Sequence, residues 1–325
     1  MAPSTFHVLG GGALGRVLGA ALARHDRLAA LLLREACHAT AAIRVHSADA
    51  SADPPAAVRV RVETSSGEGA AIGHLLVATK ANHAAVAVRG VLPRLTAASS
   101  VVFVGNGQLS VAEELREVCG AVGCSVALGS TTQAAYVPAD AGGAGDAGLD
   151  VVWAAAGDTF VGVDAGEPRP SELEWLGELA RSLERGGVPT SVDANIRQRL
   201  WEKLAANAFI NPTSALLGCT NGDCLEGDGG AALCAAVCAE VAAVGAACGV
   251  GGLDAGRLLQ YVTAVAHATC ANRSSMLQDM DAGRETEIAH INGWLAATAK
   301  ARGLACGTCE ALEALVRLKT VSRER

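Results

Sequence analysis

The sequence predicts two domains of different class, an α/β domain over residues 1–193 and an all-helical domain over residues 194–325. Three observations predict this division. Short apolar strands alternate with helical segments in the first part, a glycine-rich turn joins the first strand to the first helix, and strand signals stop near residue 195. Such alternation is typical of a mostly parallel sheet covered by helices.

The first strand, residues 6–9, runs into glycines and then into an Ala- and Leu-rich helix, and a second apolar strand follows at 28–33. The turn of this βαβ unit fits G-x-G-x-x-G. Its glycines permit a tight turn, close approach of a pyrophosphate and close helix packing. We therefore expect a Rossmann-type dinucleotide site, rather than a plain glycine-rich turn, formed by Gly10, Gly12, Ala13, Leu14 and Gly15.

The end of the second strand indicates which dinucleotide is bound. Arg34 stands there, and a guanidinium can grip a 2′-phosphate with two hydrogen bonds. The pattern therefore favours NADP (NADPH) over NAD. Glu35 follows directly and weakens this inference, because a carboxylate there could bind a ribose hydroxyl or neutralise the arginine.

Further strands are predicted at 57–64, 74–80 and 101–107. Lys80 and Asn106 lie at the carboxyl ends of the last two, where open α/β sheets bind ligands. We expect both to face the cofactor, with two plainer alternatives left open. Asn106 could serve only the turn with the glycine that follows it, and Lys80 could be a solvated charge.

Between these strands and the helical domain, residues 139–150 have the low complexity of a flexible loop, and strands resume at 151–157 and 159–164. Residues 171–187 predict an amphipathic helix with a capping box formed by Ser171 and Glu174.

Composition excludes several classes of function. The net charge is −7 without a basic cluster and aromatic residues make up 3%, so nucleic-acid binding is not expected. Without a signal peptide or membrane span, we expect a cytoplasmic protein with no membrane partner. The 11 cysteines are expected to be reduced, and the single C-x-x-C of Cys306 and Cys309 lacks the further ligands of a zinc site, so no metal is predicted.

In the helical domain, the stretch KLAANAFIN places polar residues at four-residue intervals, Lys203, Asn207 and Asn211. Four residues are just over one helical turn, so these side chains share one face of an otherwise apolar helix. The stripe is either a solvated face or a surface that binds a small oxygenated molecule.

A second helix is predicted over residues 272–300, with Asp279, Arg284 and Glu285 on a solvated face. Glu287 lies among apolar residues, where a carboxylate needs a partner, and Lys203 is the candidate.

These residues resemble the ketopantoate reductases (2-dehydropantoate 2-reductases), which reduce ketopantoate to pantoate. The resemblance spans nearly the whole chain. It rests on the glycine turn, on ATKANH around Lys80, on GNG around Asn106, and on two family-specific stretches at 201–222 and 274–293. It implies a helical domain like the C-terminal domain of 6-phosphogluconate dehydrogenase.

The resemblance also implies roles. Lys203 corresponds to the catalytic lysine and Glu287 to its partner, which also faces the cofactor. Lys80 and Asn106 face cofactor and substrate, and Arg34 grips the 2′-phosphate. The substrate residues are Asn106, Asn207, Asn211, Asn221 and Ser275. Hydride addition to a 2-oxo acid produces an alkoxide, and an ammonium group both donates a proton to it and stabilises its charge.

Two alternatives remain beside a ketopantoate reductase of pantothenate and coenzyme A biosynthesis. One is a reductase of another branched or aromatic 2-oxo acid, although an aromatic substrate would leave the amides of Asn207, Asn211 and Asn221 unpaired. The other is a non-catalytic NADPH sensor, which does not require Lys203 or Glu287. For either enzyme the expected substrate is a small 2-oxo acid. The sequence does not determine the oligomeric state, and a homodimer is one of the options.

Overall fold

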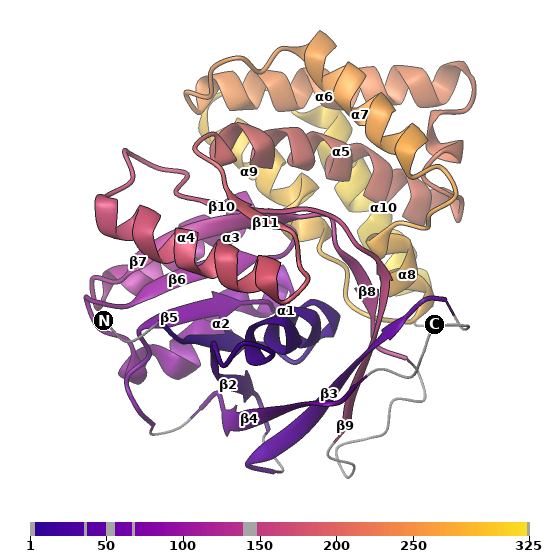
Figure 1. Ribbon diagram of the computed structural model, residues 1–325. Coiled ribbons are helices and arrows are strands. Elements are labelled where there is room, and N and C mark those ends of the chain that lie inside the picture. The colour runs from indigo at the N-terminus through magenta and orange to yellow at the C-terminus, as the bar shows by residue number, and fades with distance from the viewer. Residues whose placement is uncertain (1–3, 36–37, 50–55, 67–68, 139–147, 324–325) are drawn as a thin grey trace. The chain divides into compact units, whose positions relative to one another are not determined.

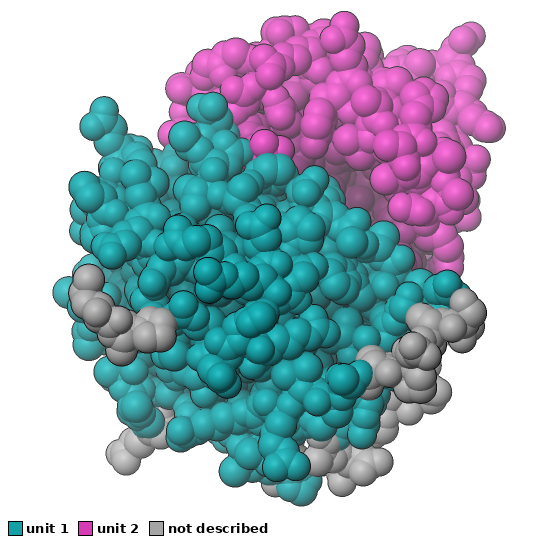
Figure 2. Space-filling view, viewed as in Figure 1, with its two compact units in different colours: residues 1–196 teal, residues 197–325 magenta. Residues whose placement is uncertain are grey.

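A computed structural model describes residues 4–35, 38–49, 56–66, 69–138 and 148–323. The chain forms two compact units, residues 1–196 and 197–325, which Figure 2 colours separately. The N-terminal unit is built on a sheet and the C-terminal unit on helices (Figure 1). The predicted fold class is therefore confirmed.

The N-terminal unit contains a sheet of 11 strands in the order β11-β10-β7-β6-β5-β1-β2-β4-β3-β9-β8. Neighbouring strands from β7 to β4 are all parallel. The strands are β1 (Phe6–Leu9), β2 (Leu28–Leu33), β3 (Thr40–Ser47), β4 (Val58–Thr64), β5 (His74–Val77), β6 (Ser100–Val104), β7 (Ser125–Thr131), β8 (Ala134–Tyr136), β9 (Gly148–Ala155), β10 (Thr159–Gly162) and β11 (Thr190–Val192).

Helices cover both faces of this sheet (Figure 1). On one face α1 contacts α4, and on the other α2 contacts α3. The bounds are α1 (Ala13–Ala23), α2 (Ala81–Val91), the 3₁₀ helix η1 (Leu92–Arg94), α3 (Gln108–Gly120) and α4 (Pro170–Arg185). Apolar side chains of α1, α4 and the central strands, including Leu18, Leu31 and Leu176, are fully buried between the layers.

Four strands, β3, β7, β8 and β11, have no counterpart among the predicted ones. Two of them, β8 and β11, are three-residue strands at the two edges of the sheet, too short to show an alternating pattern. The predicted loop at 139–150 is wrong at its end, because β9 begins at Gly148. Its residues 139–147 lie outside the described ones.

The capping box was also misplaced. Helix α4 begins at Pro170, and the box is formed by Arg169 and Glu172 rather than Ser171 and Glu174. The Glu172 carboxylate accepts the backbone N–H of Arg169 at 2.8 Å. Proline is favoured at the first position of a helix because it has no N–H to leave unpaired. The helix therefore begins at Pro170, earlier in the chain than predicted.

The C-terminal unit consists of α5 (Ile196–Leu217), η2 (Asp223–Leu225), α6 (Gly227–Ala247), α7 (Ala255–Ala268), α8 (Ser275–Asp281), η3 (Ile288–His290), α9 (Asn292–Ala301) and α10 (Gly307–Arg323). Helix α5 is buried along most of its length, and Trp201, Ala205 and Phe209 on it are buried. Burial on most sides is typical of a helix at the centre of a helical unit. The predicted helix over 203–211 is thus confirmed as part of α5.

Candidate active site

The glycine turn connects β1 to α1 as the sequence predicts, with Gly12 as the residue that precedes the helix. Gly10 has φ of 118°, a conformation that favours glycine. A Cβ atom on Gly15 would lie 2.0 Å from the carbonyl oxygen of Gly10, so the helix and turn can pack only around a glycine. A Cβ on Gly12 would meet nothing within 4 Å. The space beside Gly12, at the start of α1, is therefore open, and a helix start is where an anionic group binds favourably.

Arg16, in the first turns of α1, is a residue that sequence reasoning missed. Its guanidinium donates to the carbonyl oxygen of Gly11 at 2.8 Å and to that of Asp150, on β9, at 2.7 Å. Burial lowers the pKa of Arg16, and the charge of Asp150 opposes this shift. The side chain thus fixes the turn against a strand more than 130 residues away. Its only signal in the sequence is a single cation in an otherwise apolar helix.

The predicted cofactor residues follow four adjacent strands. The strands β6, β5, β1 and β2 are neighbours in this order and run parallel, so their carboxyl ends lie at one edge of the sheet. Asn106, Lys80, the glycine turn and Arg34 come at or soon after these ends. With strands about 4.8 Å apart, these groups extend over about 14 Å. The sheet order also reverses at β1, where α/β folds bind dinucleotides.

The individual environments along this edge differ. Arg34 directly follows β2 and is exposed, as is Glu35 beside it. Lys80 precedes the first residue of α2 and is half-buried. Asn106 is half-buried and is followed by Gly107, which has φ of 66° and starts α3. Asn106 and Gly107 therefore form the bend that connects β6 to α3, at the carboxyl end of the strand.

In the helical unit, the charge of Glu287 acts on the ammonium group of Lys203. Burial lowers the pKa of Lys203, the negative charge of Glu287 raises it, and the pKa that results is about 8. Glu287 is 8% exposed. Lys203, half-buried on α5, thus has the opposite charge of a buried carboxylate near it. A lysine with such a pKa can hold or release a proton near neutral pH.

The other predicted substrate residues lie on the same helix or are bonded to neighbouring segments. Asn207 and Asn211 follow Lys203 along α5 at intervals of four residues. Ser275 is the first residue of α8, and the hydroxyl of Ser274 before it lies 2.6 Å from that of Ser214 on α5. The structure thus holds the start of α8 against the helix that carries the polar stripe.

Asn221 follows α5 in a turn that is anchored at two points. Its backbone N–H donates to the carbonyl oxygen of Asn272, and its side-chain N–H donates to the hydroxyl of Thr269 at 3.0 Å. Its buried Oδ1 has no hydrogen-bond partner among the residues that the structure describes. A buried acceptor without a partner is costly, and a bound ligand that donates a hydrogen bond would remove this cost.

The predicted helix over residues 272–300 is wrong in two respects. It is broken into α8, η3 and α9, and Glu287 precedes η3 instead of lying within a helix. Asp279 was expected on a solvated face, yet it is 6% exposed. Arg284 donates to its carboxylate at 2.9 Å, so an ion pair compensates its burial.

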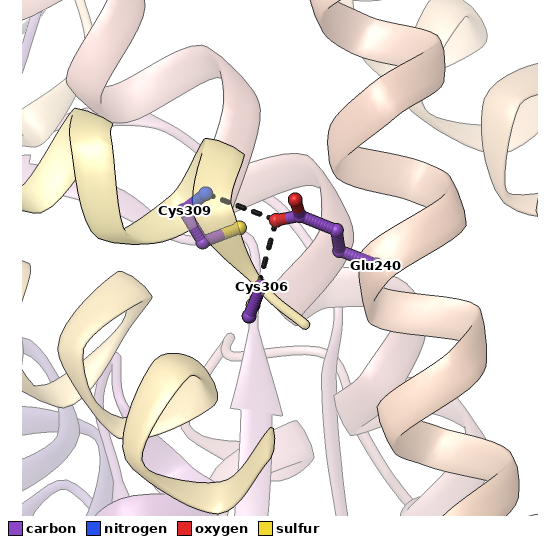
Figure 3. A group of neighbouring side chains, drawn as sticks. All are labelled: Glu240, Cys306 and Cys309. Carbon is purple, nitrogen blue, oxygen red and sulfur yellow. Dashed lines mark hydrogen bonds between the residues drawn. The ribbon is translucent and has the colours of Figure 1, made fainter. Parts of the chain in front are cut away.

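A group outside this site combines Cys306, Cys309 and Glu240 of α6, whose ligand atoms lie within 4.8 Å of one another (Figure 3). The carboxylate accepts the backbone N–H groups of Thr308 and Cys309 at 2.8 and 2.9 Å, and the Cys306 thiol donates to it at 3.4 Å. Burial alone would raise the pKa of Glu240, and these hydrogen bonds lower it. Glu240 therefore caps the start of α10, and a structural zinc site would need a fourth ligand.

Comparison with known proteins identifies the family. The protein-family model described as Ketopantoate reductase PanE/ApbA matches residues 6–158. A second family model, described as Ketopantoate reductase PanE/ApbA C terminal, matches residues 195–320. The chain belongs to the ketopantoate reductase family. The curated 2-dehydropantoate 2-reductase of Salmonella typhi is 31% identical over 253 residues, covering 77% of this chain and 75% of that protein. The protein is accordingly an oxidoreductase that acts on a CH–OH group.

Other relatives extend the match. The 2-dehydropantoate 2-reductase of Halobacterium salinarum is 28% identical over 315 residues, 96% of this chain and 97% of that protein. Among solved structures, D-mandelate dehydrogenase with NADH and anilino(oxo)acetate has a TM-score of 0.82 at 18% identity, covering 99% and 100% of the two chains. A PanE/ApbA family ketopantoate reductase from Ralstonia eutropha JMP134 has a TM-score of 0.78 at 23% identity, with the same coverage. These structures share the fold.

One helix among the described residues, α6, is long and apolar enough by length and composition to cross a membrane. It packs against α7, α9 and α10 of the same unit. Core helices of compact proteins pass the same test, so the helix is weak evidence for a membrane span.

Proposed function

We propose that this protein reduces 2-dehydropantoate (ketopantoate) to (R)-pantoate with NADPH, the step that supplies pantoate for pantothenate and coenzyme A biosynthesis. The observation that carries the proposal is the pairing of Lys203 with Glu287, in a chain that belongs to the ketopantoate reductase family. We further propose that residues 1–193 bind the cofactor, that residues 194–325 bind the substrate, and that the protein is cytoplasmic.

In this proposal the reduced nicotinamide supplies the hydride. Lys203, as an ammonium group, donates the proton to the oxygen of the 2-oxo group and stabilises the negative charge that develops there. Glu287 keeps Lys203 protonated, because its charge raises the lysine pKa against the effect of burial. Asn207, Asn211, Asn221, Ser275 and Asn106 bind the carboxylate and hydroxyl groups of the substrate, since amides and hydroxyls both donate and accept hydrogen bonds.

The cofactor residues divide by task. The N–H groups at the start of α1, with Gly10, Gly12, Ala13, Leu14 and Gly15, hold the pyrophosphate. Arg34 binds the 2′-phosphate of NADPH, and its exposed position directly after β2 supports this role. Lys80 and Asn106, after the neighbouring strands β5 and β6, are assigned to the nicotinamide end of the cofactor.

A second candidate is reduction of an aromatic 2-oxo acid. The likeness to D-mandelate dehydrogenase, which was solved with NADH and anilino(oxo)acetate, favours it. An aromatic ring would leave a buried acceptor such as Asn221 Oδ1 without a donor, whereas the hydroxyl of ketopantoate can provide one. We therefore prefer ketopantoate.

The test follows the loss of NADPH absorbance with purified protein and ketopantoate, and repeats it with NADH and with phenylglyoxylate. We expect kcat/KM to be highest for NADPH with ketopantoate. A higher value with phenylglyoxylate would replace the proposal by the second candidate, and a higher value with NADH would overturn the role of Arg34. No turnover of either acid would refute both candidates.

A further inference from the structure

Helix α5 contains a proline, Pro212, directly after Asn211. Proline has no backbone N–H, so the carbonyl oxygen of Ala208, four residues earlier, loses its regular helix partner. The proline ring also presses against that carbonyl. Because Ala208 is fully buried, water cannot replace the missing hydrogen bond at this turn.

Asn292 supplies this bond. Its side-chain N–H donates to the carbonyl oxygen of Ala208 at 3.0 Å. Asn292 is fully buried, and its Oδ1 has no partner among the described residues, so the side chain acts here as a donor only. Leaving the Oδ1 of a buried amide unpaired costs free energy, and the hydrogen bond from its N–H to the otherwise unpaired carbonyl oxygen of Ala208 offsets this cost.

The hydrogen bond from Asn292 to Ala208 connects two segments of the helical unit that carry proposed active-site residues. Ala208 lies between Asn207 and Asn211 on α5, and Asn292 comes five residues after Glu287 on the segment that leads through η3 into α9. At the far end of α5, the ammonium of Lys319 donates to the last carbonyl oxygens, those of Ala215 and Leu216, at 2.9 and 2.6 Å. The end of the helix is thus held independently. Around Pro212, Ser214 Oγ donates to the carbonyl oxygen of Asn211 at 3.1 Å, but among the bonds described it is Asn292 that reaches the carbonyl oxygen of Ala208.

We propose that Asn292 is a positioning residue for the reduction: it replaces the helix hydrogen bond that Pro212 removes, and thereby fixes Asn207 and Asn211 relative to the Glu287 segment. This inference rests on the proposed function of the site. It assigns Asn292 no contact with substrate or cofactor.

The test is a double-mutant cycle between positions 292 and 212. Asn292→Leu keeps the volume and removes the donor, and Pro212→Ala restores a backbone N–H for Ala208. Thr320→Val is the matched control, since it removes a side-chain donor to the carbonyl oxygen of Val316, within a regular part of α10 where a backbone N–H serves that carbonyl as well. Each variant is assayed for kcat, for the KM of ketopantoate, and for the Kd of NADPH without substrate.

We expect Asn292→Leu to raise the KM for ketopantoate about tenfold, to lower kcat, and to leave the Kd of NADPH within about twofold, because an unpaired buried carbonyl shifts one helical turn in the helical unit only. In the Pro212→Ala background the same substitution should change KM about threefold or less. Thr320→Val should match the wild type.

An equal fold-change of KM in both backgrounds would overturn the proposal, as would a parallel loss of NADPH binding, which would indicate general unfolding. A wild type without turnover would instead refute the proposed function. The cycle would then be measured on Tm, where Asn292→Leu should lower Tm by about 5 °C and by less in the Pro212→Ala background. Additive changes in Tm would show that Asn292 does not replace the missing bond.

Discussion

The candidate binding side chains of the N-terminal unit are exposed or half-buried, whereas three of those in the helical unit are buried and Ser275 there is exposed. Arg34 is exposed and the start of α1 opens onto free space at Gly12. In the helical unit, Glu287, Asn211 and Asn221 are exposed by only 8%, 7% and 9%. The exposed groups can bind charge without cost to folding, because they remain hydrated when no ligand is present.

The buried groups have a different effect. Polar side chains in a desolvated environment cost free energy unless they have partners, and their pKa values shift. Lys203, with its pKa lowered to about 8, shows this shift directly. Substitutions in the N-terminal unit should therefore change cofactor affinity, and substitutions in the helical unit should change catalysis and stability together.

The largest effect is expected for Lys203→Ala, which removes the proton donor. The value of kcat for ketopantoate should fall by about 10²- to 10⁴-fold, the usual contribution of a general acid, while NADPH binding persists. The measurement is steady-state kinetics together with NADPH titration. Lys300→Ala, an exposed lysine on α9, is the control and should retain wild-type kcat. Retention of activity by Lys203→Ala would show that another group donates the proton.

The next prediction compares substitutions of two glycines in the same turn, which should differ in their effects on stability and on NADPH affinity. Gly15→Ala places a Cβ atom 2.0 Å from Gly10 O, so it should lower both Tm and NADPH affinity. Gly12→Ala meets nothing within 4 Å, so Tm should change little while the Kd of NADPH rises about tenfold, because the methyl group occupies the space of the pyrophosphate. Thermal unfolding and fluorescence titration check this pair. Unchanged NADPH binding in Gly12→Ala would place the pyrophosphate elsewhere.

A smaller effect is expected for Arg34→Ala, which removes the cation proposed to bind the 2′-phosphate. The KM for NADPH should rise about tenfold, as expected for a charge-assisted hydrogen bond at a hydrated site, and the KM for NADH should hardly change. Glu35→Ala is the matched control beside it. A similar rise for both cofactors would contradict the assignment of Arg34 to the phosphate.

The smallest effect concerns the pH dependence. Only the protonated Lys203 donates, so kcat for the reduction should be constant below its pKa and fall as the pH rises through about 8. Glu287→Gln removes the charge that raises this pKa, so the fall should begin at a lower pH. The profile is recorded from about pH 6 to 10 for both proteins. A shift to higher pH would show that Glu287 does not stabilise the ammonium form.

Local patterns in the sequence were sufficient for several elements that carry candidate site residues. The glycine turn and the strand ends that carry Lys80 and Asn106 in the N-terminal unit, and the helix through Lys203 in the helical unit, all depend on periods of two to four residues or on the conformational freedom of glycine. Such features are set by neighbours along the chain. The same is true of Gly15, whose packing against Gly10 is contained within six residues.

Tertiary structure decided what local patterns could not. The adjacency of β6, β5, β1 and β2 arises from crossovers, and Asn292 reaches Ala208 across 84 residues. The burial of Asp279 likewise depends on the segments packed around it. The end of α8, in contrast, has a local signal that the polar periodicity of residues 272–300 concealed: Gly283 adopts φ of 62°, and the backbone N–H of Arg284 donates to the carbonyl oxygen of Asp279. Desolvation and long-range hydrogen bonds act between segments that the sequence keeps far apart, so local patterns do not reveal them.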